Sequence, residues 1–421
     1  MQRRWRDFGE VQATGVCSVV YSSQFGNLER EIYGGKKVDE KVLYNFIELL
    51  MSQLIKLDGI AADCYVKFER RLQKLSYDNK DIALSPYNEY WRQMRKICTL
   101  HLFSMKQVNS FRSVREEEVF DMIDRVKGAF GKRLSEYDDG NHEGARFYEL
   151  MLQTQEMFDN FYYRDYFPLM GWLDKLNGSM ARLEKVFKDL DEFYQELIDE
   201  HLNQNRTNKT QDDMVDILLK LKQEYSAYLT FDHIKGLGAT DTSASAVVWM
   251  MTLLIKNPDS SKKVQQEDDL YKLDYLKAVI KETFRLYPAL PLLVPPESRD
   301  RCILERYEIP KKTLVYVNAW AVGRDPKCWE RTEEFEPERF MSSSIDYKGA
   351  YFDLIPFGSG RRGCPGLSFG STTVELALSN LVYSFDWELP EGTNDIDTLK
   401  TEGLVMHKKN ALLLVAKVPD N

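Results

Sequence analysis

The chain has 421 residues, of which 43% are hydrophobic and 12% aromatic, so its apolar side chains suffice for a sizeable core. Its formal net charge is −9 and its pI is near 5.4, and the sequence contains neither a basic tail nor a basic helical stripe. These features exclude a general nucleic-acid-binding protein, because binding to phosphates needs clustered Lys and Arg.

The first 67 residues contain no motif, and we leave them unassigned as a divergent N-terminal segment, although residues 42–57 could form an amphipathic helix. The longest apolar stretch of the chain, residues 246–255, falls short of the roughly 20 residues that a membrane-spanning helix needs. No apolar stretch follows the positive charges near the start, so a secretory signal is not expected either. The sequence therefore offers no recognisable membrane anchor.

Helical periodicity dominates the remainder of the chain. Apolar residues recur at spacings of three and four over residues 112–130 and 183–198, which predicts helices that bury one face. A further helix is expected over residues 273–286, ended by a tyrosine and a proline. Alternation over residues 314–318, and a weaker alternation over residues 411–416, predicts short strands. The expected fold is mainly α with a small β portion.

The six cysteines lack the CxxC spacing of common metal sites, so we expect a reducing compartment and mostly buried thiols. Cys364 needs a separate explanation, because it stands between a glycine-rich loop and an apolar helical pattern. A thiolate at a helix N-terminus is favoured by the helix dipole and by unpaired backbone N–H groups, which makes Cys364 a candidate ligand for a soft metal. Phe357 can shield such a thiolate from water. The alternative is a buried structural cysteine, the usual state of a lone Cys.

The loop sequence FGSGRRGCPG resembles the heme-binding loop of the cytochrome P450 superfamily. The resemblance implies that Cys364 is the axial ligand to the iron of heme b and that Arg362 pairs with a heme propionate. It also implies that Phe357 covers the sulfur, and that Gly360 and Gly366 permit the tight loop.

A second motif, KETFR, places Glu282 and Arg285 three residues apart, so both side chains project from one face of a helix. Alone, such a pair is more often a solvated surface bridge. The later sequence FEPERF supplies Arg339, which matches the third member of the family's buried Glu-Arg-Arg network. The implied role of this network is structural.

The segment GATDTS is similar to the family's oxygen-activating segment, which lies in a long helix above the heme. Oxygen activation needs protons, and Asp241 with Thr242 could orient a water chain that delivers them. Gly238 and Ala239 would line the oxygen groove, with Ala239 standing where the family pattern has glycine. The alternative for this segment is an ordinary helix interior with a solvent-facing Asp241.

The stretch WRQMR resembles the family's WxxxR helix, in which Trp91 and Arg95 lie on one side and bind a propionate. Arg suits this task because its guanidinium presents a fixed fork of donors. An ordinary amphipathic basic helix is the alternative for this motif alone.

Taken together, the motifs imply a cytochrome P450 fold with a heme domain over residues 68–421. Sequence stretches such as SPYNEYWRQMRK are similar to the plant microsomal group of this family. The implied activity is a monooxygenase that inserts oxygen from O2 into a small apolar specialised metabolite, with electrons from NADPH through NADPH-cytochrome P450 reductase. The resemblance places the protein at the endoplasmic reticulum membrane on the cytoplasmic face, whereas the lack of a recognisable anchor leaves the cytoplasm as the alternative.

Two departures from the family pattern leave other functions open. No apolar turns separate residues 231–235 from Gly238, so the oxygen-activating helix is expected to be short and the chain a truncated family member. Pro296 replaces an arginine that is expected to contact a propionate. The alternatives are therefore a heme-binding but catalytically inactive protein, or a thiolate-heme isomerase or dehydratase, although retention of Thr242 argues against the latter.

Overall fold

The structure is a computed structural model, and it describes residues 74–78, 80–128, 142–159, 173–203, 213–236, 241–267, 273–304, 306–401 and 404–418. All of these residues belong to the second of the two compact units into which the chain divides, Lys67–Asn421. The N-terminal segment up to residue 67, with its possible helix over residues 42–57, lies outside the described residues. The proposed start of the heme domain at residue 68 lies outside them as well.

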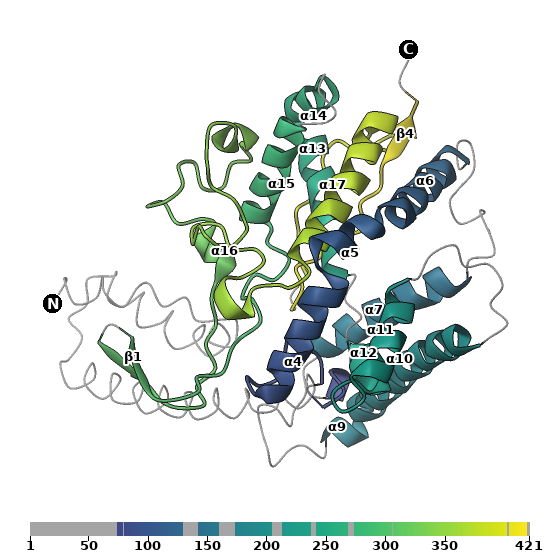
Figure 1. Cartoon of the computed structure of the whole chain (residues 1–421). Helices are drawn as coiled ribbons and strands as arrows, with labels where there is room; N and C mark the ends of the chain where they lie inside the picture. Colours follow the sequence, from purple (N-terminus) through teal and green to yellow (C-terminus); the bar gives the residue numbers. More distant parts are fainter. Residues whose placement is uncertain are drawn as a thin grey trace. The chain divides into compact units, whose positions relative to one another are not determined.

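The described part of the chain is mainly helical (Figure 1). Its longer helices are α4 (Glu89–Ile97), α6 (Arg112–Gly128), α7 (His142–Asp159), α10 (Ser179–Leu202), α11 (Met214–Glu224), α13 (Asp241–Lys256), α14 (Pro258–Gln265), α15 (Asp274–Leu286) and α17 (Leu367–Ser384). The shorter ones are η1 (Cys98–Leu102), α5 (Met105–Ser110), α9 (Leu173–Leu176), α12 (Phe231–Gly236), α16 (Ala319–Val322), η4 (Pro337–Phe340) and η5 (Gly360–Arg362).

The predicted helices are present, and capping groups explain several of their ends. α6, α10 and α15 fall on the three segments for which periodicity predicts helices. α4 begins where the side chain of Asn88 accepts the backbone N–H of Trp91, with N and O 2.8 Å apart. α11 begins with a reciprocal capping box between Asp213 and Asp216. These caps involve only residues close in sequence, so they favour these helix starts independently of tertiary packing.

The largest hydrophobic cluster joins α13, α15 and α17, with contributions from α6 and α14. Figure 1 shows α13, α15 and α17 packed beside one another in the upper part of the view. The buried Met250 and Leu254 of α13 belong to this cluster together with Leu276 of α15 and Leu378 of α17. None of the helices in the described ranges is both long enough and apolar enough to cross a membrane.

A second cluster joins α4 and η1 to α10, α11 and α12. Met94 and Ile97 of α4 pack there with Leu218 of α11 and Ile234 of α12. α4 therefore has an apolar side that is fixed to this second group of helices, while Arg95 is half-buried at the edge of it. This arrangement orients the WRQMR motif.

The β portion consists of two antiparallel pairs among the described residues, β1 (Cys302–Leu304) with β2 (Tyr307–Ile309), and β3 (Asp386–Glu388) with β4 (Val415–Lys417). The prediction of a strand over residues 314–318 is wrong, because only Leu314 pairs there, in an isolated bridge with Glu297. The alternation over residues 411–416 yields only the start of β4. A strand needs a hydrogen-bonded partner as well as an alternating pattern, and the pattern alone does not supply one.

Candidate functional site

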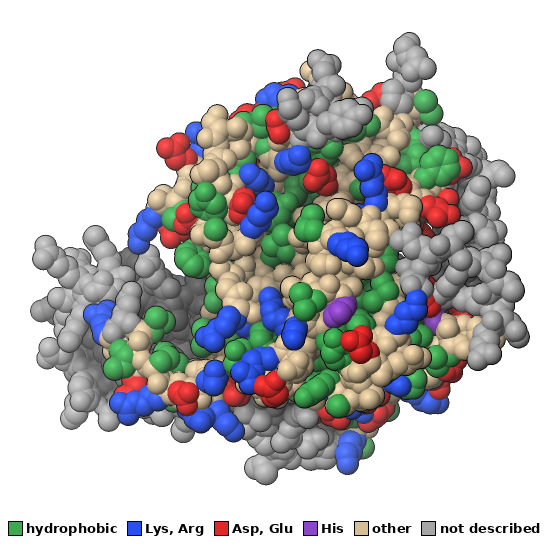
Figure 2. Space-filling view, in the orientation of Figure 1, with side chains coloured by type: hydrophobic (Ala, Val, Ile, Leu, Met, Phe, Trp, Pro, Cys, Tyr) green, Lys and Arg blue, Asp and Glu red, His purple; other side chains and the backbone are tan. Residues whose placement is uncertain are grey.

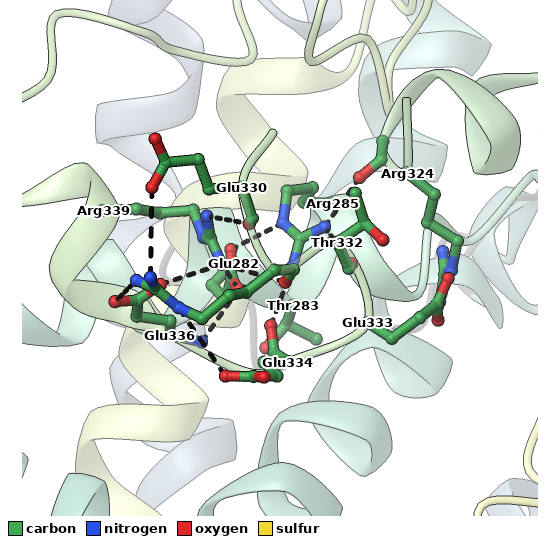
Figure 3. Close-up of polar contacts among 12 residues, drawn as sticks. Glu282, Thr283, Arg285, Arg324, Glu330, Thr332, Glu333, Glu334, Glu336 and Arg339 are labelled. Atoms are coloured by element: carbon green, nitrogen blue, oxygen red, sulfur yellow. Dashed lines mark hydrogen bonds and ion pairs between the residues drawn. The ribbon is translucent and has the colours of Figure 1, made fainter. Parts of the chain in front are cut away.

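Glu282, Arg285 and Arg339 form a buried ionic network, as the two motifs predict (Figure 3). Arg285 donates from Nε and Nη2 to the two carboxylate oxygens of Glu282, at 2.8 Å each, and neither side chain is exposed. Nε of Arg339 lies 3.2 Å from Oε1 of Glu282. The surface-bridge alternative is therefore wrong.

Arg285 also binds the backbone of the long segment that follows α16. Its Nη1 donates to the carbonyl oxygens of Gly323 and Thr332, at 2.7 and 2.6 Å, and its Nη2 donates to that of Glu334 at 2.9 Å. Since these bonds and the two to Glu282 together satisfy every N–H of the guanidinium, one side chain fixes three points of a segment that has little regular structure. The network thus anchors the segment that leads towards the Cys364 loop.

The loop from Phe357 to Cys364 is closed by its own backbone. The N–H of Cys364 donates to the carbonyl oxygen of Phe357 at 2.8 Å, and the N–H of Gly363 donates to that of Gly360 at 3.1 Å. Gly360 has a φ of +66° and Gly358 one of +68°, a left-handed conformation that side chains other than glycine rarely adopt. Both positions therefore favour glycine because of their backbone conformation, and Gly358 is one that the motif comparison did not single out.

The ring of Phe357 packs into the core beside this loop. It meets Phe284 of α15 edge to face, with ring centroids 5.3 Å apart, and lies 5.6 Å from the ring of Tyr347. The residue therefore ties the loop to α15 through its ring and receives the Cys364 N–H through its carbonyl oxygen. Its expected role as a cover for the sulfur stays a prediction.

Cys364 lies directly before α17, which begins at Leu367 after the cap residue Gly366. The side chain is exposed, yet enough protein surrounds the sulfur that desolvation raises the pKa of the thiol. The Cys364 sulfur is thus accessible but has protein on most sides, so it lies in a concave part of the surface. The Gly366 N–H donates to the sulfur and Arg95 lies nearby, and both act in the opposite direction by lowering the pKa of the thiol.

Gly366 also leaves room beside the sulfur. A Cβ atom placed there would lie 3.9 Å from Sγ of Cys364 and 3.7 Å from the ring of Phe103. A larger side chain at this position would occupy the space next to the sulfur. The absence of a side chain at Gly366 thus keeps the space beside the Cys364 thiol open.

The structure brings Trp91, Arg95 and Arg362 together at the edge of the same loop. The Arg95 guanidinium carbon lies 5.5 Å from the Trp91 ring centroid and that of Arg362 lies 4.6 Å from it. Nη2 of Arg95 donates to the carbonyl oxygen of Gly363 at 2.6 Å, directly before Cys364. Burial lowers the pKa of the Arg95 guanidinium, and burial with repulsion from Arg95 lowers that of Arg362.

The GATDTS segment lies partly outside the described residues. α13 begins at Asp241, Thr242 is half-buried in its first turn, and α12 ends at Gly236. Gly238 and Ala239 lie between the two helices and outside the described residues. Ser243 lies close to α17, because its Oγ is 3.7 Å from the place that a Cβ of Gly370 would take. The first turn of α13 therefore approaches α17 one turn after the Cys364 loop.

Motif comparison did not single out Tyr87. The Tyr87 ring lies 5.0 Å from the Trp91 ring, and the Arg361 guanidinium carbon lies 5.4 Å from the Tyr87 ring. In Figure 2, Lys and Arg side chains gather over α4 and the loops beside it.

The prediction of mostly buried thiols is wrong for the described cysteines, because Cys98 is buried whereas Cys302, Cys328 and Cys364 are exposed.

Comparison with known proteins identifies the family. The family model described as Cytochrome P450 matches residues 126–415. The chain is 43% identical over 397 residues to Cytochrome P450 71A1 of Persea americana, covering 82% of this chain and 78% of that protein. It is 43% identical over 399 residues to 6,7,8-trihydroxycoumarin synthase of Pastinaca sativa, covering 82% of this chain and 78% of that protein. It is 40% identical over 389 residues to strychnine-11-hydroxylase of Strychnos nux-vomica, covering 82% of this chain and 76% of that protein.

The fold agrees with this family. A zebra fish cytochrome P450 solved with progesterone matches with a TM-score of 0.68 at 22% sequence identity, covering 83% of this chain and 87% of that one. At this identity the likeness concerns the fold alone. The family uses heme, O2 and a redox partner, and the chain belongs to the cytochrome P450 family as a monooxygenase of the plant type.

Proposed function

We propose that this monooxygenase inserts one oxygen atom from O2 into a small lipophilic or aromatic plant specialised metabolite, with electrons from NADPH through NADPH-cytochrome P450 reductase. The observation that carries the proposal is the arrangement of Cys364, whose accessible sulfur receives the Gly366 N–H directly before α17. The substrate class is supported by relatives named 6,7,8-trihydroxycoumarin synthase, 5-OH-xanthotoxin synthase and strychnine-11-hydroxylase.

The residues around Cys364 fit a heme b group. The sulfur is accessible, no side chain at Gly366 fills the space next to it, and the nearby Arg95 and Arg362 suit the two carboxylates of this cofactor. Heme bound through the Cys364 thiolate would supply the iron chemistry that activates O2, with the thiolate as an electron-donating ligand.

Each residue near the loop has a proposed task in holding the cofactor. Arg95 and Arg362 bind its carboxylates, and Trp91 supports both guanidinium groups through its ring. Gly360 supplies the left-handed turn and Phe357 closes the loop on the protein side of the sulfur. Cys364 remains the metal ligand.

We assign proton delivery to Asp241 and Thr242, at the start of the helix that approaches α17. A hydroxyl and a carboxylate in one helical turn can hold a water molecule and pass a proton along it. Gly238 and Ala239 line the oxygen groove in this proposal. Residues 68–421 form the heme domain, and by family resemblance the enzyme works on the cytoplasmic face of the endoplasmic reticulum membrane.

The proposal is tested by expressing the chain with a heme supply and recording the spectrum of the reduced carbon monoxide complex. We expect the thiolate-type Soret band, and we expect Cys364→Ala to abolish it while the exposed Cys328→Ala retains it. A wild-type spectrum without this band would contradict the assignment. Product formation from aromatic substrates with NADPH and a plant reductase then separates the monooxygenase from an inactive heme protein, and Thr242→Ala is expected to keep the band while lowering product per NADPH consumed.

A further inference from the structure

Four arginines lie on two neighbouring aromatic rings at the edge of the Cys364 loop, and we call them the arginine cluster: Arg95, Arg299, Arg361 and Arg362. Arg95 and Arg362 contact the Trp91 ring at 5.5 and 4.6 Å. Arg299 and Arg361 contact the Tyr87 ring at 4.9 and 5.4 Å. Because the two rings are only 5.0 Å apart, the cluster is continuous.

Arg299 reaches the cluster from a backbone that is well fixed. Leu293, earlier in the same segment, lies with its Cδ1 3.8 Å from the place that a Cβ of Gly358 would take. The N–H of Val315 donates to the carbonyl oxygen of Pro296 at 2.9 Å, and the N–H of Ser298 donates to that of Thr313 at 2.7 Å. The segment therefore runs from the Cys364 loop to Tyr87, and its last anchored residue stands directly before Arg299.

The charges of the arginine cluster are balanced only in small part by protein, through the attraction of the Asp81 carboxylate for Arg362. Among the described residues, no carboxylate lies within ion-pair distance of any of its four guanidinium groups, and the hydrogen bonds of Arg95 and Arg362 go to the neutral carbonyl oxygens of Gly363 and Ala83. Cation–π contacts offset only part of the repulsion, at about 0.5–1 kcal/mol for an exposed site. By contrast, the exposed Arg301 of the same segment has an ion-pair partner in Glu308 at 3.0 Å.

Such a cluster calls for an anion that carries more than one charge and is held beside Cys364. In the proposed function, on which this inference rests, the two carboxylates of heme are such an anion. We infer that Arg299 binds a heme carboxylate together with Arg95 and Arg362. Pro296, three residues earlier, has no donor to offer, and Arg299 provides the positive charge from the same segment.

The test measures how fast heme leaves the holoprotein for an excess of apomyoglobin. We expect Arg299→Gln to accelerate heme loss about fivefold, as the removal of one charge-assisted hydrogen bond at a partly exposed site implies. The matched control Arg301→Gln removes another exposed arginine from the same segment and is expected to leave the rate unchanged. The difference between wild type and Arg299→Gln should also shrink at high ionic strength.

Two further measurements separate carboxylate binding from a merely structural role. With heme dimethyl ester, whose carboxylates carry no charge, wild type and Arg299→Gln should lose the cofactor at the same rate. Adding Pro296→Arg to Arg299→Gln should restore slow loss of ordinary heme. Equal rates of ordinary heme loss from wild type and Arg299→Gln, or an undiminished difference with the ester, would overturn the role of Arg299 alone. A wild-type chain that takes up no heme would overturn the proposed function and this inference together.

Discussion

Trp249 of α13 donates its indole N–H to the carbonyl oxygen of Met406, with N and O 2.8 Å apart although the two residues are 157 positions apart in the chain. The hydroxyl of Ser245, one helical turn earlier, donates to the same oxygen at 2.8 Å. The N–H of Met406 donates in turn to the carbonyl oxygen of Ala289, just beyond α15, at 2.8 Å. One residue of an irregular segment is thus held both to α13 and to the chain directly after α15.

Replacing Trp249 with Phe should loosen the segment around Met406. The variant keeps an aromatic ring against Tyr287, whose ring lies 4.0 Å away, but it removes one of the two donors to the Met406 carbonyl oxygen. We expect a loss of about 1 kcal/mol in the free energy of unfolding, because Ser245 still satisfies that oxygen. Urea unfolding and amide hydrogen exchange of residues 404–408 measure the effect.

Trp320→Phe is the matched control, because Trp320 contacts Arg324 and Lys400 with its ring and is only half-buried. It should leave exchange near Met406 unchanged. Faster exchange in both variants, or in neither, would show that the Trp249 hydrogen bond does not hold the segment.

Glu282→Gln should be among the most destabilising isosteric substitutions in the described part of the chain. The amide keeps the shape of the side chain but leaves Arg285, which is wholly buried, and Arg339, which is nearly so, without their shared carboxylate. Breaking a buried ion pair in this way costs about 3–5 kcal/mol. The free energy of unfolding is measured by urea titration at pH 7.

Glu192→Gln provides the comparison for that experiment. Glu192 pairs with Lys188 at 3.3 Å on the exposed side of α10, and loss of such a pair costs less than about 1 kcal/mol. If Glu282→Gln were no more destabilising than Glu192→Gln, the network would not carry the stability that its burial implies.

Gly323→Ala should destabilise the same region for a steric reason. A Cβ at this position would lie 2.3 Å from the carbonyl oxygen of Arg285, a backbone atom that cannot rotate away. Because Nη1 of Arg285 also donates to the Gly323 carbonyl oxygen, any shift that relieves the contact disturbs the ionic network as well. We expect a loss of about 1–3 kcal/mol, the usual cost of overpacking.

Gly236→Ala tests the same change without the clash, since its Cβ would meet Asp81 at an ordinary 3.5 Å. Thermal unfolding of the two variants should separate them clearly, with Gly323→Ala melting at the lower temperature. The opposite order would mean that the backbone at Arg285 yields easily.

Features that depend on neighbours in the chain were predictable from the sequence. The spacing of Glu282 and Arg285 puts both on one helical face, and the left-handed turn at Gly360 follows from the glycine itself. The strand over residues 314–318 was mispredicted because alternation says nothing about whether a partner strand is available. Within this stretch only Leu314 is part of a β-bridge.

Features that depend on distant contacts were not predictable. No motif singles out Tyr87 or Arg299, and the contact between the Arg299 guanidinium and the Tyr87 ring beside Trp91 follows only from how the segment after α15 crosses the loop before α4. The same holds for the Met406 carbonyl oxygen, because every residue has such a group and only tertiary packing brings Ser245 and Trp249 to this one.

His233 should make the stability of the protein fall in mild acid. Its ring is buried 4.9 Å from the ring of Tyr90, and its Nδ1 accepts the backbone N–H of Thr230 at 2.8 Å, which requires a neutral imidazole. Burial lowers the pKa of His233 and the Lys80 ammonium lowers it further, while Asp232 opposes both. The unfolded chain, in which the pKa of His is about 6.5, therefore binds a proton at a higher pH than the folded one does.

Between these two pKa values the free energy of unfolding decreases as the pH is lowered, and the contribution of neutral His233 is fully present only above about pH 6.5. His233→Gln removes this proton linkage, so its melting temperature should fall less than that of wild type between pH 7.5 and 5.5. Thermal unfolding of both proteins across this range decides the point, because the two curves converge towards low pH if His233 titrates as described. Parallel curves would exclude His233 as a source of acid sensitivity.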